Sequence, residues 1–315
     1  MDKFGRAPLI ASEEIRKNFR KSLILVLVIV ALVIGASLWI GEMLNDRRLG
    51  IIIGAVVVAV VLPIQILTAK WAILAMARGR AADPSDLRER RAIHIVEGLA
   101  ISAGLSKTPD LYIIPTSVPN AFASGLNEKG AFIGVTQGLL DMMDDQELEG
   151  VIAHEIAHIV HRDVMVCQIA ASMQTAMLVL AEVIQWVGYF VAIFASTRSR
   201  SDRDDDNGKE VIAGLLVYLL IKPVTWFIST ILTMSISRKR EYAADAFAVR
   251  LCSYNEGLAR ALEKLSGDAP RYNGEIADAL GGNAVAPMYI YYPLDSLFST
   301  HPSTKERIRR LRNMV

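Results

Sequence analysis

Two long apolar stretches near the start of the chain constrain its fold more than any other feature. Residues 22–40 and 49–69 contain no ionisable side chain. A helix rises ~1.5 Å per residue, so about 20 apolar residues match the ~30 Å hydrocarbon core of a bilayer. A signal peptide is the alternative for the first stretch, but its apolar core would span only ~7–15 residues before a small-x-small cleavage site. We therefore expect two retained membrane-spanning helices.

Two further apolar blocks lie in the middle of the chain. Residues 165–195 contain one charged side chain, Glu182, and the only charged side chain in residues 211–234 is Lys222. The blocks predict two more membrane helices, although a hairpin packed partly against the protein would give the same pattern. Charges at membrane depth usually face a bundle interior or an aqueous cavity, so Glu182 and Lys222 could pair, or each could lie near an interface. The polar residues 196–210 predict a solvated linker.

Composition and charge agree with a membrane protein. Hydrophobic residues make up 52% of the chain, and 34 basic residues nearly balance 33 acidic ones. This balance argues against a nucleic-acid-binding surface, and two cysteines cannot form a disulfide framework. Six Lys and Arg residues precede the first span, two lie in the loop 41–48, and five lie in residues 78–91. The positive-inside rule therefore predicts that both ends of the first hairpin lie in the cytoplasm. With the apolar blocks, this predicts a multi-pass protein of the cell membrane.

These patterns divide the chain into four segments. Residues 1–80 would form an N-terminal cytoplasmic segment and a transmembrane hairpin, and residues 164–234 would form two further apolar helices around the linker. Residues 81–163 and 235–315 would form the two parts of one polar domain. Together these two parts are long enough to bury a core.

Local patterns in the first polar part predict both helix and sheet. Residues 86–103 have a helical pattern, whereas residues 111–115 and 131–135 are short β-like runs. The sequence N-E-K-G at residues 127–130 predicts a hairpin turn before the second run.

The most informative motif lies on the helix that follows. Asp144 and Glu147 have the spacing of a capping box, and His154, Glu155 and His158 form an H-E-x-x-H motif further along. The i, i+4 spacing places both imidazoles on one helix face, where they can ligate one zinc ion. Glu155 can then take a proton from a zinc-bound water that attacks a peptide carbonyl. The alternative is a helix with two purely structural histidines.

A catalytic zinc site needs a third protein ligand. A third histidine at the metzincin spacing is excluded because that position is Val164. His161 cannot easily join the other two histidines around one tetrahedral ion, so we expect it at a surface or an interface. Glu241 on a downstream helix would complete a His₂Glu site, and Asp245 one turn later could orient a ligand histidine. The alternative for Glu241 is simple pairing with basic neighbours on a solvated face.

The chain resembles the HtpX family of membrane-bound zinc metalloproteases, which is related to the CAAX prenyl proteases. The resemblance covers nearly the whole chain: two leading spans, H-E-I-A-H, two further apolar blocks, R-K-R-E-Y-A-A-D at 238–245 and a late H-P element. It implies one Zn²⁺ held by His154, His158 and Glu241, with Glu155 as general base. It also implies a mainly α, integral membrane fold with about four transmembrane helices and an α+β, gluzincin-like protease domain carrying a small sheet with an edge strand.

A shorter element extends the resemblance to a substrate strand. The sequence N-A-F-A-S-G at residues 120–125 resembles a family segment that forms the edge strand of the active site. Free backbone groups there could pair with an extended substrate by strand addition. The implied substrate-binding residues are Asn120, Ala121, Phe122 and Ala123. Without the resemblance, an asparagine after Pro119 indicates only a turn.

The late H-P element is H-P-S-T-K-E-R at residues 301–307. The resemblance implies that His301 stabilises the oxyanion and that Arg307 pairs with Asp245 or a neighbouring acid. The alternative for His301 is a loop histidine that caps a following helix. Asp163 also matches a family position, where anchoring of the zinc helix at the membrane boundary is one hypothesis.

The sequence therefore predicts a membrane-bound zinc endopeptidase whose active site faces the cytoplasm. Its partners would be polypeptide substrates and the lipid bilayer, with no nucleic acid. Cleavage of misfolded membrane proteins, and so a role in stress response, is implied by the resemblance alone. Two other functions remain open: a proteolytically silent zinc scaffold, for which Glu155 would be unnecessary, and a carrier or channel built around Glu182 and Lys222.

Overall fold

The structure is a computed structural model, and it describes residues 7–43, 46–169, 172, 181–182, 184–186, 189–190, 193, 238–268 and 302–314. The chain forms two compact units. The first contains Met1–Ser22, Ala69–Ile169 and Met234–Val315, and the second contains Leu23–Thr68 and Ala170–Thr233. The first 22 residues thus belong to the same unit as both polar segments.

The two leading apolar stretches form helices of spanning length, as predicted. The first is α1 (Ala7–Met43). The second is a continuous run of α2 (Arg47–Val56), the π-helical turn η1 (Val57–Val61) and α3 (Leu62–Met76). The segments Arg16–Glu42 and Arg47–Met76 are long and apolar enough to cross a membrane by length and composition.

Small residues let α1 and α2 approach closely within the second unit. A Cβ added at Gly50 would lie 2.5 Å from the Ser37 carbonyl oxygen and 2.9 Å from the Gly41 Cα. A Cβ added at Gly54 would lie 3.1 Å from the Ser37 Cβ. Small residues four apart on each helix therefore allow the backbones to touch, a packing mode common between membrane helices.

The two later apolar blocks are described only in part. Residues 163–169 are helical, and so is Glu182, whose side chain is exposed. The block 211–234 with Lys222, and the linker 196–210, lie outside the described residues. Two of the about four predicted spans are therefore described, and both alternatives for Glu182 and Lys222, a pair or separate positions near an interface, stay hypotheses.

A small mixed sheet lies in the first unit. Its strand order is β1 (Arg80–Ala81), β2 (Asp110–Ile114), β4 (Phe132–Thr136) and β3 (Ala121–Ser124). β2 and β4 run parallel, while β3 pairs antiparallel with β4 and so occupies an edge. The two predicted β-like runs and the hairpin between β3 and β4 are confirmed.

Helix caps in this unit follow the sequence closely. Asp86 caps α4 (Leu87–Ser102), and Thr136 caps the short α5 (Gln137–Met142). The predicted capping box at the start of α6 (Asp145–Val160) is present in full, because the Asp144 and Glu147 side chains each accept from the other's backbone N–H. α6 therefore begins where the polar side chains satisfy its first amide groups.

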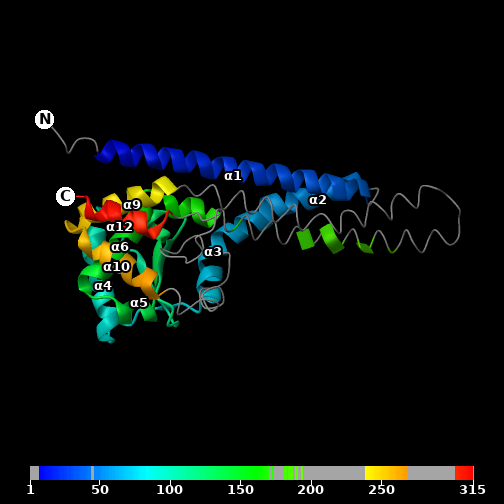
Figure 1. The fold of residues 1–315 in the computed structure, drawn as a ribbon. Helices are drawn as coiled ribbons and strands as arrows, with labels where there is room; N and C mark the ends of the chain where they lie inside the picture. Colours follow the sequence, from blue (N-terminus) through cyan, green and yellow to red (C-terminus); the bar gives the residue numbers. More distant parts are fainter. Residues whose placement is uncertain are drawn as a thin grey trace. The chain divides into compact units, whose positions relative to one another are not determined.

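The motif-bearing α6 lies at the centre of the first unit (Figure 1). α4 and β3 pack against it, as do α9 (Arg238–Cys252) and α10 (Glu256–Asp268), while α12 (Thr304–Arg312) packs on α9 and α10. The approach of α10 is close, since a Cβ on Gly150 of α6 would meet the Leu258 nitrogen at 2.6 Å. Nearly every side chain of α6 beyond its first turn is buried, so the core fixes the helix rigidly.

Candidate metal centre

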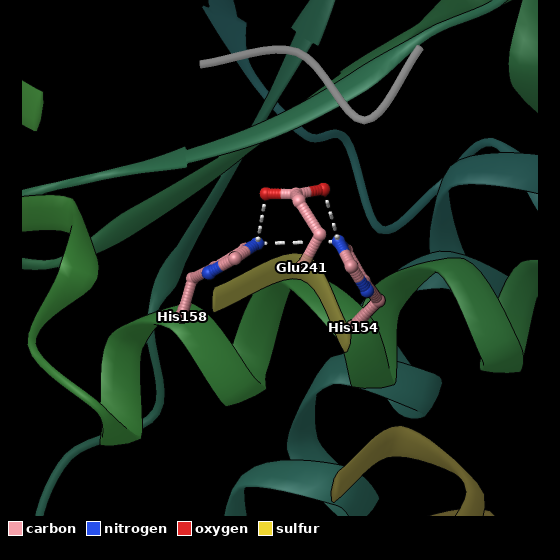
Figure 2. Close-up of side chains that lie close together, drawn as sticks. All are labelled: His154, His158 and Glu241. Atoms are coloured by element: carbon pink, nitrogen blue, oxygen red, sulfur yellow. Dashed lines mark hydrogen bonds and ion pairs between the residues drawn. The ribbon is translucent and has the colours of Figure 1, made fainter. Parts of the chain in front are cut away.

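Three side chains from two helices converge in the first unit (Figure 2). His154 and His158 project from one face of α6, and their Nε2 atoms lie 3.2 Å apart. Glu241 extends from the first turn of α9, with Oε2 3.7 Å from His154 Nε2 and Oε1 3.6 Å from His158 Nε2. One ligand atom from each of the three residues lies within 4.8 Å of the others.

These distances fit one tetrahedral zinc ion. Zinc–nitrogen and zinc–oxygen bonds of about 2.0–2.2 Å separate neighbouring ligand atoms by about 3.3–3.6 Å in a tetrahedron. The two Nε2 atoms are 3.2 Å apart, and each lies 3.6 or 3.7 Å from a different oxygen of Glu241, so all three separations are close to this range. Glu241 is only 4% exposed, so the alternative that it lies on a solvated face is wrong. Two imidazole nitrogens and one carboxylate leave the fourth position open, as in catalytic rather than structural sites.

Asp245 and Arg307 lie behind the first histidine. His154 Nδ1 is 3.0 Å from Asp245 Oδ1. Arg307 on α12 donates two hydrogen bonds to the same carboxylate, from Nη2 to Oδ1 at 2.7 Å and from Nε to Oδ2 at 3.0 Å. The Arg307 Nη1 also lies 3.5 Å from Glu241 Oε2. An Nδ1–H donated to Asp245 would leave the His154 Nε2 lone pair directed at the metal position.

Asp163 holds the second histidine in the same way. Its Oδ2 lies 3.0 Å from His158 Nδ1, and its Oδ1 lies 3.4 Å from Arg240 Nη1. The sequence suggested only that Asp163 anchors the zinc helix at the membrane boundary, and it indicated no role for Arg240. A continuous α6 would place Asp163 about 140° away from His158 around the helix. The helix ends at Val160, however, and Arg162 adopts a left-handed conformation (φ 61°), which brings Asp163 back to His158.

The protein groups around the two histidines shift their pKa values in opposite directions. Burial and the nearby Arg307 charge lower the pKa of His154 to about 4. Burial also acts to lower the pKa of His158, but the hydrogen bond with Asp163 and the Glu241 charge outweigh it and raise that pKa to about 9. His154 is therefore already neutral at pH 7, as a metal ligand must be, whereas His158 must lose a proton to bind metal.

Glu155 has the properties of a poised base. Its side chain is buried, and Oε1 has no hydrogen-bond partner among the described residues. Burial, together with the charge of Glu241, raises the pKa of Glu155 to about 7, although the nearby His158 charge and a backbone contact with Ala123 act in the opposite direction. A carboxyl group with a pKa near neutrality can both accept and return a proton at physiological pH.

The remaining predicted site residues are placed as follows. Ala121, Phe122 and Ala123 belong to the edge strand β3, which packs against α6, and all three are buried together with Asn120. The Asn120 side-chain Oδ1 accepts from the Ala121 backbone N–H at 3.0 Å. His301 lies outside the described residues.

His161 was expected at a surface or an interface, and the surface position is wrong. Its side chain is only 7% exposed, and its ring packs edge-on against Phe247 with centroids 5.3 Å apart. It serves as the C-cap residue of α6 and is not part of the His154–His158–Glu241 group. The turn that redirects the chain towards Asp163 buries this histidine, a change of direction that helical periodicity does not reveal.

A buried H-E-x-x-H helix beside a small mixed sheet, with a carboxylate supplied by a second helix, defines the class of zinc-dependent metallopeptidases. Comparison with known proteins agrees. The sequence model of Peptidase family M48 matches residues 86–315, and the chain belongs to this family of metalloproteases.

Similar proteins carry the name Protease HtpX homolog. The one from Persephonella marina is 42% identical over 226 residues, covering 70% of this chain and 73% of that protein. The one from Syntrophobacter fumaroxidans is 36% identical over 292 residues, covering 91% of this chain and 97% of that protein. The crystal structure of S. mikatae Ste24p is similar at 19% identity with a TM-score of 0.47, covering 95% of this chain and 66% of that one.

Proposed function

We propose that the chain is a membrane-bound zinc endopeptidase in which His154, His158 and Glu241 hold one Zn²⁺ and Glu155 is the general base. The observation that carries the proposal is the convergence of His154, His158 and Glu241, which each offer one ligand atom within 4.8 Å of the other two, the donor set of a catalytic zinc site. The buried Oε1 of Glu155 on the same helix has no hydrogen-bond partner among the described residues, and a purely structural zinc site does not need such a carboxylate.

Each protein group has a distinct task in peptide hydrolysis. Zinc in such a site supplies Lewis acidity, which polarises the peptide carbonyl and lowers the pKa of water. Glu155 takes the proton of the attacking water and returns it to the leaving amine, a task for which its pKa of about 7 is suited. Asp245 and Asp163 hold the two histidine rings by their Nδ1 atoms, so that both Nε2 atoms stay directed at the metal.

Substrate binding is proposed to involve the edge strand β3 and His301. An extended polypeptide would add to β3, with Asn120, Ala121, Phe122 and Ala123 contacting it. For this to happen, the Ala121 N–H must exchange the Asn120 side chain for a substrate carbonyl. His301 would stabilise the oxyanion, since the H-P element leads directly into α12, which already supplies Arg307 to the site.

The proposed setting is the cytoplasmic face of the cell membrane. Two helices of spanning length in the described residues support a membrane location, and the distribution of basic residues supports cytoplasmic polar parts. With two more spans in the central blocks, the polar parts 81–163 and 235–315 would be joined through the metal. Substrates would then be polypeptides at that surface, misfolded membrane proteins among them.

The test is cleavage of a fluorescently labelled unfolded polypeptide by the full chain in detergent. Glu155→Gln should reduce kcat by about 10²–10⁴-fold, the usual contribution of a general base, with zinc content unchanged. A zinc chelator should abolish cleavage, and added Zn²⁺ should restore it. The matched control is Glu149→Gln, a half-buried carboxylate on the same helix, which should retain wild-type activity.

Three outcomes would refute the proposal: full activity of Glu155→Gln, activity insensitive to chelation, or a wild-type protein that binds no zinc. A protein that binds zinc but never cleaves would favour the silent scaffold instead.

A further inference from the structure

A buried asparagine from the N-terminal helix reaches the metal-binding region. Asn18 lies on α1 and is 1% exposed. Its side-chain Nδ2 donates to Asp163 Oδ1 at 2.8 Å and to the His161 carbonyl oxygen at 3.0 Å. All three residues belong to the first compact unit, although Asn18 is more than 140 positions away in sequence.

These contacts continue directly to a proposed zinc ligand. Asp163 uses Oδ2 for His158 Nδ1, while Oδ1 receives Asn18 and, at the longer distance of 3.4 Å, Arg240. The carboxylate plane is therefore defined by partners on both oxygens. The second contact of Asn18, to the carbonyl of His161, fixes the turn between His158 and Asp163.

We propose that Asn18 is a positioning residue for the metal centre and that it acts through Asp163 on His158. The inference rests on the zinc site proposed above. A carboxylate held on one oxygen only can rotate about its Cβ–Cγ bond, and the imidazole hydrogen-bonded to it then loses its fixed orientation. With Asn18 in place, the His158 Nε2 stays aligned with His154 and Glu241.

Packing alone does not account for an asparagine at this position. Burial of an amide costs free energy unless its polar atoms are hydrogen-bonded. The Asn18 Oδ1 has no hydrogen-bond partner among the described residues, whereas its nitrogen makes two contacts. A leucine of similar size would avoid that cost. Asn18 donates a hydrogen bond to Asp163 while its own Oδ1 lacks a partner among the described residues. This is expected if the hydrogen bond to Asp163 is the reason for an asparagine at this position.

This role makes α1 part of the metal centre. The helix that carries the first apolar stretch also supplies, from its N-terminal half, a hydrogen bond two contacts away from a proposed zinc ligand. No sequence pattern indicates this role, because Asn18 lies among basic residues in a segment expected to be a cytoplasmic tail.

The test measures zinc affinity of the full chain in detergent by competition with a chromogenic chelator. Loss of the hydrogen-bond partner of a ligand histidine weakens metal binding by about 10–100-fold. Asn18 contacts that partner rather than the histidine itself, so we expect Asn18→Leu to raise the zinc Kd by roughly 3–10-fold. Asn18→Asp preserves the shape of the side chain but replaces the hydrogen-bond donor by an acceptor, so it should also weaken zinc binding. It provides a second test in case Asn18→Leu does not fold. Ser22→Ala is the matched control, because Ser22 is buried one turn later on α1 and its hydroxyl has no partner among the described residues.

A double-mutant cycle with Asp163→Asn separates positioning from general destabilisation. If Asn18 acts through Asp163, Asn18→Leu should change the zinc Kd much less in the Asp163→Asn background than in the wild type. Equal effects in both backgrounds, or wild-type affinity in both Asn18 variants, would overturn the inference. Failure of the wild type itself to bind zinc would instead refute the proposed site.

Discussion

Replacing Arg307 with methionine should lower the free energy of unfolding of the first unit by about 3–5 kcal/mol, the cost of removing one partner from a buried ion pair. Arg307 is 2% exposed and holds the Asp245 carboxylate, itself 1% exposed, through two hydrogen bonds. It also lies 3.5 Å from Glu241. Methionine fills much of the volume of arginine, but it leaves two buried carboxylates without their shared cation.

The pKa shifts show the same interdependence. Burial acts to raise the pKa of Asp245, but the charge of Arg307 and the contact with His154 hold it below its usual range. Without Arg307, Asp245 would be stabilised mainly by His154, whose ring would then be drawn towards the protonated form. The loss of stability should therefore be smaller when zinc is bound, because the metal compensates the charge of Glu241 and keeps His154 neutral.

Thermal unfolding in detergent, followed by intrinsic fluorescence, is a suitable assay. For a unit of this size 1 kcal/mol corresponds to about 2–4 °C, so Arg307→Met should lower Tm by roughly 6–20 °C. Arg309→Met is the matched control on the same helix: Arg309 is 71% exposed and pairs with Glu306, so the change should cost at most about 1 kcal/mol. Equal Tm values for Arg307→Met and Arg309→Met would refute the reasoning.

Two further predictions concern the helix hairpin and the ligand protons. Gly50→Leu should lower Tm in detergent, because the new side chain would collide with the α1 backbone. Gly35→Leu is the control and should leave Tm unchanged, since no atom lies within 4 Å of a Cβ added at Gly35. Equal Tm changes in the two variants would argue against close α1–α2 packing. Zinc binding should release close to one proton at pH 8 and almost none above pH 10, because His158, with a pKa of about 9, must become neutral to bind. Calorimetry in two buffers of different ionisation enthalpy measures this number, and a value near zero at pH 8 would contradict it.

Short-range patterns carried most of the correct predictions. The capping box at Asp144 and Glu147 depends on groups three residues apart, and the shared helix face of His154 and His158 depends on groups four apart. The regular geometry of a helix fixes the relative positions of residues three or four apart, so these contacts can be predicted without knowledge of the fold. The lengths of the apolar helices were predictable for the same reason, since they depend only on the number of consecutive apolar residues.

The contacts that complete the site depend on where separate segments meet. Glu241 was predicted as the third ligand, but its distances to the two histidines follow from the packing of α9 on α6. The partner of His158 was missed because the backbone turns at Arg162 and changes the direction in which Asp163 points.

The sequence by itself determined the apolar helices, the H-E-x-x-H face and the chemistry of the ligands, because each depends on residue type and on spacing within one helix. The tertiary structure decided which carboxylates hold which histidine and placed Asn18 of α1 beside Asp163. No periodicity along the chain encodes those pairings. They arise when the part of α1 up to Ser22 packs with α6, α9 and α12 in one unit and their buried polar groups must find partners among one another.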